Sequence, residues 1–148
     1  LLDWNNEIIW QYGDNGDQIY KYSTNASAKS DLSIITKDID FGDPSRRKKI
    51  YKVYITYDTG NATSNLHVHY RTNGNASSNY NFANGTNFSG NELATANGWA
   101  IAELKPNNSA EANNIKSFQL VFLESGGSVA SGLKINDISI VYRNKGIK

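Results

Sequence analysis

The chain has 148 residues, a net charge of +1 at pH 7 and no cysteine. This length suits one domain that buries roughly 70% of its unfolded surface, so no disulfide or metal is required for stability. The composition excludes thiol catalysis and zinc–thiolate sites, and the small net charge does not favour nucleic acid or an anionic membrane as a partner. No apolar run approaches the roughly 20 residues that cross a bilayer.

Short strands separated by polar turns are predicted along the first third of the chain. Three of them precede residue 42, at residues 7–11, 18–22 and about 32–41. A Gly-Asp-Pro turn follows, and then comes the most regular alternation in the sequence. Its side chains on one face are expected in the core: Tyr51, Val53, Ile55 and Tyr57.

A second alternating segment covers residues 66–71. Leu66, Val68 and Tyr70 are expected inward, and His67, His69 and Arg71 outward. Because this segment lies close in sequence to the strand at 51–57, we expect the two strands to form an antiparallel hairpin.

The second half of the chain begins with an Asn-, Gly- and Ser-rich stretch at residues 73–97, which predicts a long, partly strand-like excursion. Trp99 is expected in the core, at the start of a strand that ends at Leu104. Two further strands are predicted at residues 115–123 and 133–143. The last one changes phase midway, which predicts a β-bulge at Asn136 or Asp137.

About eight such strands predict an all-β fold, an antiparallel two-sheet β-sandwich of the jelly-roll type. The alternative architecture is a closed barrel. We find no internal repeat and no linker, so residues 1–148 are expected to form a single domain.

Three segments also carry a family resemblance: TKDIDFGDPSRRKKIYKVYITY at 36–57, AELKPNNSAEANNIKSFQLVF at 102–122 and LKINDISIVYRNKGIK at 133–148. They are similar to a domain of structural proteins of tailed phages, particularly marine ones, whose tails contain nozzle, hub and fibre components. The resemblance implies a non-enzymatic virion protein of the tail that contacts other virion proteins and forms homo-oligomers in the particle. Tail nozzle proteins are much longer, so it further implies a C-terminal part, a processed product or a stand-alone relative.

Two groups of cations are candidates for contacts with neighbouring subunits. One follows the Gly-Asp-Pro turn and the other lies at the end of the chain: Arg46, Arg47, Lys48 and Lys49, and Arg143, Lys145 and Lys148. A solvated turn is the plainer interpretation of the first group. Nucleic acid is disfavoured as the partner because no wider basic face accompanies these residues.

Carbohydrate or receptor binding is the alternative function, because flat aromatic rings on a β-sandwich can stack on the sugars of a host surface glycan. The candidate rings are Trp4, Trp10, Tyr12, Tyr54 and Tyr80. The competing interpretation is that large aromatic residues belong to the core.

Metal and catalytic sites have weaker support. Carboxylates near two turns could bind a structural calcium ion, although no full calcium-loop pattern is present: Asp14, Asp17, Asp38, Asp40 and Asp43. His67 and His69 share a strand face, but no third metal ligand is near in sequence. No nucleophile motif surrounds any serine, so we expect no cofactor and no enzymatic activity.

Overall fold

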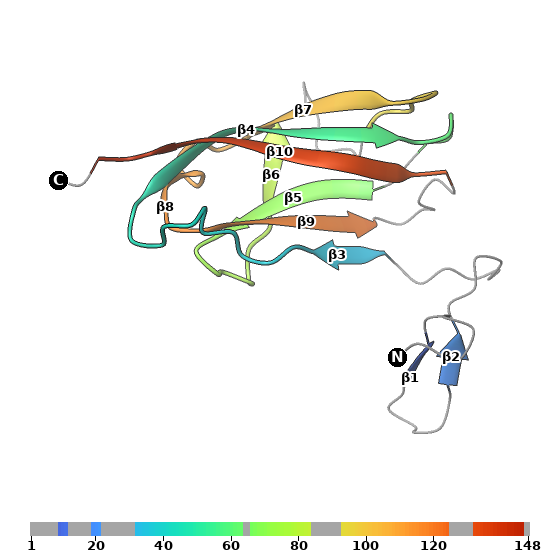
Figure 1. Ribbon diagram of the computed structural model, residues 1–148, viewed down its shortest axis with the longest axis horizontal. Coiled ribbons are helices and arrows are strands. Elements are labelled where there is room, and N and C mark those ends of the chain that lie inside the picture. Colours follow the sequence, from blue (N-terminus) through green and yellow to red (C-terminus); the bar gives the residue numbers. More distant parts are fainter. Residues whose placement is uncertain are drawn as a thin grey trace. The chain divides into compact units, whose positions relative to one another are not determined.

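Ten strands and no helix make up the described part of this computed structural model (Figure 1). The structure describes residues 9–11, 19–21, 32–63, 66–83, 93–124 and 132–146. The strands are β1 (Ile9–Gln11), β2 (Ile19–Lys21), β3 (Ser33–Ile35), β4 (Lys48–Asp58), β5 (Leu66–Thr72), β6 (Tyr80–Ala83), β7 (Ala100–Pro106), β8 (Asn113–Ile115), β9 (Phe118–Glu124) and β10 (Lys134–Asn144). Every strand pairing is antiparallel.

The chain divides into two units where the sequence predicted one domain. In the first, residues 1–30, β1 and β2 form a two-stranded sheet with Trp10 opposite Tyr20. The second, residues 31–148, contains the other eight strands. Everything described below concerns this second unit.

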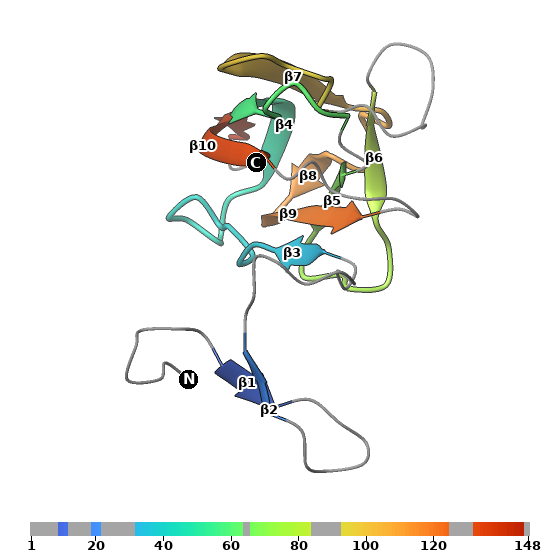
Figure 2. The same cartoon turned by 90° about the vertical axis from the view of Figure 1, so that its right-hand side faces the viewer.

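The eight strands form one hydrogen-bonded sheet in the order β10-β4-β7-β6-β5-β9-β3, and β8 pairs with the start of β4. Strand β6 pairs with β5 through Tyr70 and Tyr80 and with β7 through Phe82 and Pro106. Figure 2 shows β10, β4 and β7 on one side and β5, β9 and β3 on the other, with β6 between them. The predicted all-β antiparallel class is confirmed, while the pairing connects all eight strands in one sheet.

The core contains apolar side chains from both sides of the bent sheet. Each is at most 4% exposed: Ile50, Val53, Ile55, Tyr57, Leu66, Val68, Tyr70, Phe82, Leu93, Leu104, Ala112, Ile115, Phe118, Leu120 and Phe122. Burial of each large apolar side chain contributes about 1.5–3 kcal/mol. The alternation predicted for β5 is confirmed, since Leu66, Val68 and Tyr70 are buried and the residues between them are not.

Two irregularities interrupt the pairing of β4 with β10. Asn136 is skipped between the pairs Ile135–Tyr57 and Asp137–Thr56, which confirms the predicted bulge. A second shift leaves Tyr51 without an opposite residue on β10. This shift changes the phase of β4, so Tyr51 is 38% exposed and Ile50 is buried. The prediction that Tyr51 lies in the core is therefore wrong.

The predicted hairpin between the strands at 51–57 and 66–71 is also wrong. Strand β4 pairs with β10, β7 and β8, whereas β5 pairs with β6 and β9. The connection between β4 and β5 joins the two sides of the sheet, which lets the apolar faces of both strands share one core. The closeness of the two strands in sequence predicted that they pair with each other. In the structure they lie on opposite sides of the sheet, and each buries its apolar face in the shared core.

Trp99 does not belong to the core, contrary to the sequence prediction. It is 59% exposed and directly precedes β7, in which Ile101 is 69% exposed. The opposite face of this strand supplies a half-buried Ala102 and the fully buried Leu104. Within the described residues, no helix has the length and apolar character needed to span a bilayer.

Candidate functional site

The turn at residues 40–45, which is stabilised by hydrogen bonds from its own side chains, leads to the basic segment at residues 46–49. The Asp40 carboxylate accepts the backbone N–H of Gly42 at 2.9 Å. The Asp43 carboxylate accepts the N–H of Ser45 at 3.0 Å and its hydroxyl at 2.5 Å. Phe41 and Gly42 both have positive φ angles, 59° and 78°, so the chain reverses sharply here. Side chains of the turn therefore hold its backbone in place.

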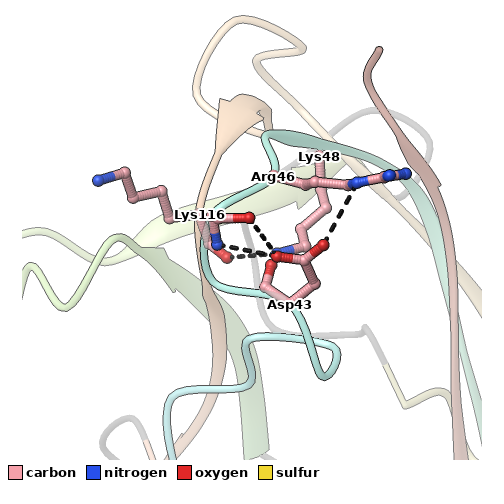
Figure 3. A network of polar contacts seen from close by, with 5 residues as sticks. Asp43, Arg46, Lys48 and Lys116 are labelled. Atoms are coloured by element: carbon pink, nitrogen blue, oxygen red, sulfur yellow. Dashed lines mark hydrogen bonds and ion pairs between the residues drawn. The ribbon is translucent and has the colours of Figure 1, made fainter. Parts of the chain in front are cut away.

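Lys48, the first residue of β4, points into the protein and is fully buried. Its ammonium donates to the backbone carbonyl oxygen of Asp43 and, at 3.0 Å, to that of Lys116 (Figure 3). Its nitrogen also lies 6.0 Å from the centre of the Phe41 ring. Lys48 was predicted at a subunit contact, but the structure uses its charge inside the fold, since strand alternation turns it inward.

A pocket of about 630 Å³ opens where the turn, β8 and the end of β10 meet. It is lined by Ser45, Arg46, Arg47, Asn113, Asn114, Lys145 and Gly146. The Arg47 guanidinium donates to the carbonyl oxygen of Asn114 at 3.0 Å, and the N–H of Lys145 donates to the carbonyl oxygen of Arg47 at 2.7 Å. These two bonds bring three separate segments of the chain together.

Positive charge dominates the pocket, because Arg46, Arg47 and Lys145 line it and no carboxylate is among the described residues that line it. Arg46 contacts Asp43 at 3.3 Å just outside, and both side chains are nearly half exposed. Such an exposed pair contributes little to stability. The hydrogen bond from Ser45, together with the Arg46 charge, lowers the pKa of Asp43. The pocket is suited to an anionic group.

The remaining predicted contact residues lie beside the pocket or outside the described residues. Lys49 stands opposite Arg143 across the β4–β10 pairing, and its ammonium lies 5.1 Å from the centre of the Tyr51 ring. Like charges opposite each other destabilise a sheet. An acidic partner would relieve this repulsion. Lys148 lies outside the described residues.

Of the predicted glycan-stacking rings, the structure describes the side chains of Tyr54 and Tyr80. Tyr54 is half-buried on the outward face of β4, and its hydroxyl donates to Glu103 at 2.9 Å. Tyr80 packs against Tyr70 with ring centroids 5.5 Å apart. Trp10 lies in β1, where only the backbone is described, and Trp4 and Tyr12 lie outside the described residues. Trp99 was not predicted among these rings, because an aromatic residue at the start of a predicted strand was expected in the core, whereas the Trp99 side chain is exposed.

Glu103 is the centre of a polar cluster on the outward face of β4 and β7. Lys52 and Lys105 approach its carboxylate at 2.9 and 3.1 Å. Hydrogen bonds from Lys52, Lys105 and Tyr54, in that order, lower the pKa of Glu103 to about 2. The cluster is solvent-accessible, and both of its lysines are paired with the same carboxylate, which leaves one excess positive charge.

The candidate calcium ligands have structural partners. Asp38 accepts the Ser117 hydroxyl at 2.7 Å, while Asp40 and Asp43 stabilise the turn. In the part of the chain that the structure describes, no group of three or more His, Asp or Glu side chains could hold a metal ion. Asp14 and Asp17 lie outside that part.

The two histidines lie side by side on the outward face of β5. The rings of His67 and His69 are stacked with centroids 5.9 Å apart, and Nδ1 of His69 lies 2.7 Å from the side-chain oxygen of Asn81. This contact involves an amide rather than a further metal ligand.

The pocket thus combines residues that the sequence predicted with residues that it did not. Arg46, Arg47 and Lys145 were expected at contacts, whereas Asn113 and Asn114 were missed. Their only local signal is an Asn-Asn pair, and Asn114 adopts a positive φ of 64°, which asparagine tolerates. Compared with known proteins, the chain matches no family model, no curated protein and no solved structure.

Proposed function

We propose that this chain is a non-enzymatic assembly module that docks on an acidic surface of a neighbouring protein through the basic pocket. The observation that carries the proposal is the convergence of Arg46, Arg47 and Lys145 on one cavity, whose described lining contains no carboxylate. Two basic segments that are far apart in sequence contribute to the same surface.

The chemistry of binding follows from the side chains present. A guanidinium presents paired N–H donors that match the two oxygens of a carboxylate, and Arg47 is held in place by its bond to Asn114. Single exposed ion pairs contribute about 0.2–1 kcal/mol each, so one pocket binds weakly. Repetition of the contact around a symmetric assembly makes the weak contacts add up.

A pair of charge-reversal variants tests the docking site. Arg46→Glu/Lys145→Glu alters the pocket, whereas Lys116→Glu/Lys134→Glu alters two exposed cations that do not line it. Both double variants change the net charge by the same amount. Binding to immobilised poly-L-glutamate is expected to weaken on the order of tenfold in the pocket variant and much less in the control. Equal weakening of both variants would mean that the pocket is not the docking site.

The resemblance to tailed-phage structural proteins supports the virion tail as the place of assembly. Antibody–gold labelling of intact phage particles, with serum against this chain, tests the location. Gold confined to the tail supports the proposal. Gold on filaments or cell surfaces, with none on phage, would overturn the proposed location.

Glycan recognition is a second candidate, favoured by the exposure of Trp99, directly before β7, and of Ile101 within it. An exposed indole can stack on a sugar ring. A glycan array probed with the wild type, Trp99→Ala and the control Tyr54→Phe tests it. We expect saturable signals that Trp99→Ala loses and Tyr54→Phe keeps, and absence of signal for the wild type would remove this candidate.

A further inference from the structure

Strand β10 forms one edge of the eight-stranded sheet and pairs, among the described strands, only with β4. It is 11 residues long, and all of its residues except Ile138 and Ile140 are exposed. In Figure 2 no described strand lies beside β10 on the side away from β4. The opposite edge, β3, has only three residues. Within the described residues, the sheet therefore has one long edge whose backbone groups have no partner strand.

Natural proteins usually protect such an edge with proline, with inward-pointing charges or with a very short strand. The centre of β10 has none of these features, since residues 138–142 read ISIVY. Val141 and Tyr142 are 42% and 38% exposed. The nearest charges on either side of this centre are those of Asp137 and Arg143. An uncharged segment with a negative charge on one side and a positive charge on the other favours antiparallel pairing with a second copy of the same strand.

We propose that two copies of this chain pair edge to edge through β10, antiparallel and centred on Ile140. In this register Asp137 of each copy lies opposite Arg143 of the other, and Ile138 lies opposite Tyr142. Both charged residues share the outward face with Ser139 and Val141, so each opposite-charge pair is formed between direct cross-strand neighbours. The paired edges join the two sheets into one.

The positions of the charged residues favour this register over the registers shifted by one or two residues. Centring the pair on Ser139 instead would place Asp137 opposite Val141 and Arg143 opposite Ile135, and both ion pairs would be lost. A shift that changes the parity would place inward residues opposite outward ones. The proposal does not depend on what the basic pocket binds, because neither Asp137 nor Arg143 lines that pocket.

Charge reversal tests the register in the full-length chain. Asp137→Arg and Arg143→Asp each place like charges opposite each other in a homodimer. The double variant Asp137→Arg/Arg143→Asp restores opposite charges, and so does an equimolar mixture of the two single variants. Sedimentation velocity over a concentration series measures association, and circular dichroism verifies that each variant is folded. Lys134→Glu, outside the paired segment, is the control.

We expect each single variant to associate on the order of tenfold more weakly than the wild type. The double variant, the mixture and the Lys134→Glu control are expected to associate about as strongly as the wild type. A wild type that stays monomeric at all concentrations would overturn the proposal. Single variants that associate normally, or a double variant and mixture that fail to recover, would overturn it as well. Variants at Arg46 and Lys145 should leave this association unchanged, which separates it from docking at the pocket.

Discussion

The ammonium of Lys48 donates a hydrogen bond to the carbonyl oxygen of Lys116 at 3.0 Å, and so joins the start of β4 to the connection between β8 and β9. The same ammonium donates to the carbonyl oxygen of Asp43 in the preceding turn. One buried cation therefore joins the turn, the start of β4 and the β8–β9 connection. Its neighbours Arg46 and Arg47 line the basic pocket.

Replacing Lys48 with methionine is expected to lower the free energy of unfolding by about 1–3 kcal/mol, because two carbonyl groups in partly buried hydrogen bonds lose their donor while the aliphatic volume is kept. Urea denaturation measures the change. The control is Lys116→Met, whose exposed side chain should alter stability by less than about 0.5 kcal/mol. A Lys48→Met protein as stable as the wild type would contradict the buried role.

The pKa of Glu103 should show whether the cluster of Glu103 with Lys52, Lys105 and Tyr54 forms in solution. Its pKa is about 2 in the folded protein against an ordinary value of 4.5, so its contribution to stability is present above pH 4.5 and is lost as the pH falls toward 2. Carboxyl carbon NMR of the wild type should show the low value. Lys52→Met removes the largest cause and should move the pKa toward 4.5. A wild-type value already near 4.5 would show that the cluster does not form.

Tyr57 and Tyr70 should resist ionisation. Burial raises the pKa of both phenols above the ordinary value of 10, and the Tyr57 hydroxyl donates to the carbonyl oxygen of Ala94 at 3.0 Å. The neutral form is therefore favoured in the folded state. Stability should be unaffected below pH 10 and should fall above it, as the unfolded chain ionises first. Ultraviolet titration should show a fraction of the tyrosines that ionises only when the protein unfolds, and this fraction should be smaller in Tyr70→Phe. Complete ionisation of the folded protein near pH 10 would disprove this.

Two glycines allow a matched test of close packing. A Cβ on Gly132 would lie 3.1 Å from the Cα of Gly60 and 3.3 Å from the carbonyl oxygen of Thr59, whereas a Cβ on Gly146 would meet nothing within 4 Å. Gly132→Ala should lower stability by about 1–3 kcal/mol, and Gly146→Ala should be near neutral. Thermal unfolding of both variants measures this, and an equal effect would mean that residues 60 and 132 are not in contact.

Regular alternation made much of the fold predictable. The inward face of β5 follows from a period of two, and the phase change in residues 133–143 predicted the bulge at Asn136. The pairing of β4 with β10 and β7 could not be predicted in the same way. Alternation identifies the buried face of a strand but does not identify the neighbour of that strand.

The candidate site was predictable only in part, for a related reason. The basic run indicated a surface at residues 46–49, yet Lys48 is buried because the strand begins within the run. Composition does not show where a strand begins. The contribution of Asn113 and Asn114 depends on β8 pairing with β4, which is a long-range contact.

The dependence of β4 on β10 also affects how the chain must fold. Residues 48–58 find their longest partner at residues 134–144, and β5 finds β9 about 50 residues further along, so few pairings are local. Chains dominated by distant contacts fold over milliseconds to seconds, because a long loop must close before any pairing stabilises it. During synthesis, β4 cannot complete its pairing until β10 has left the ribosome.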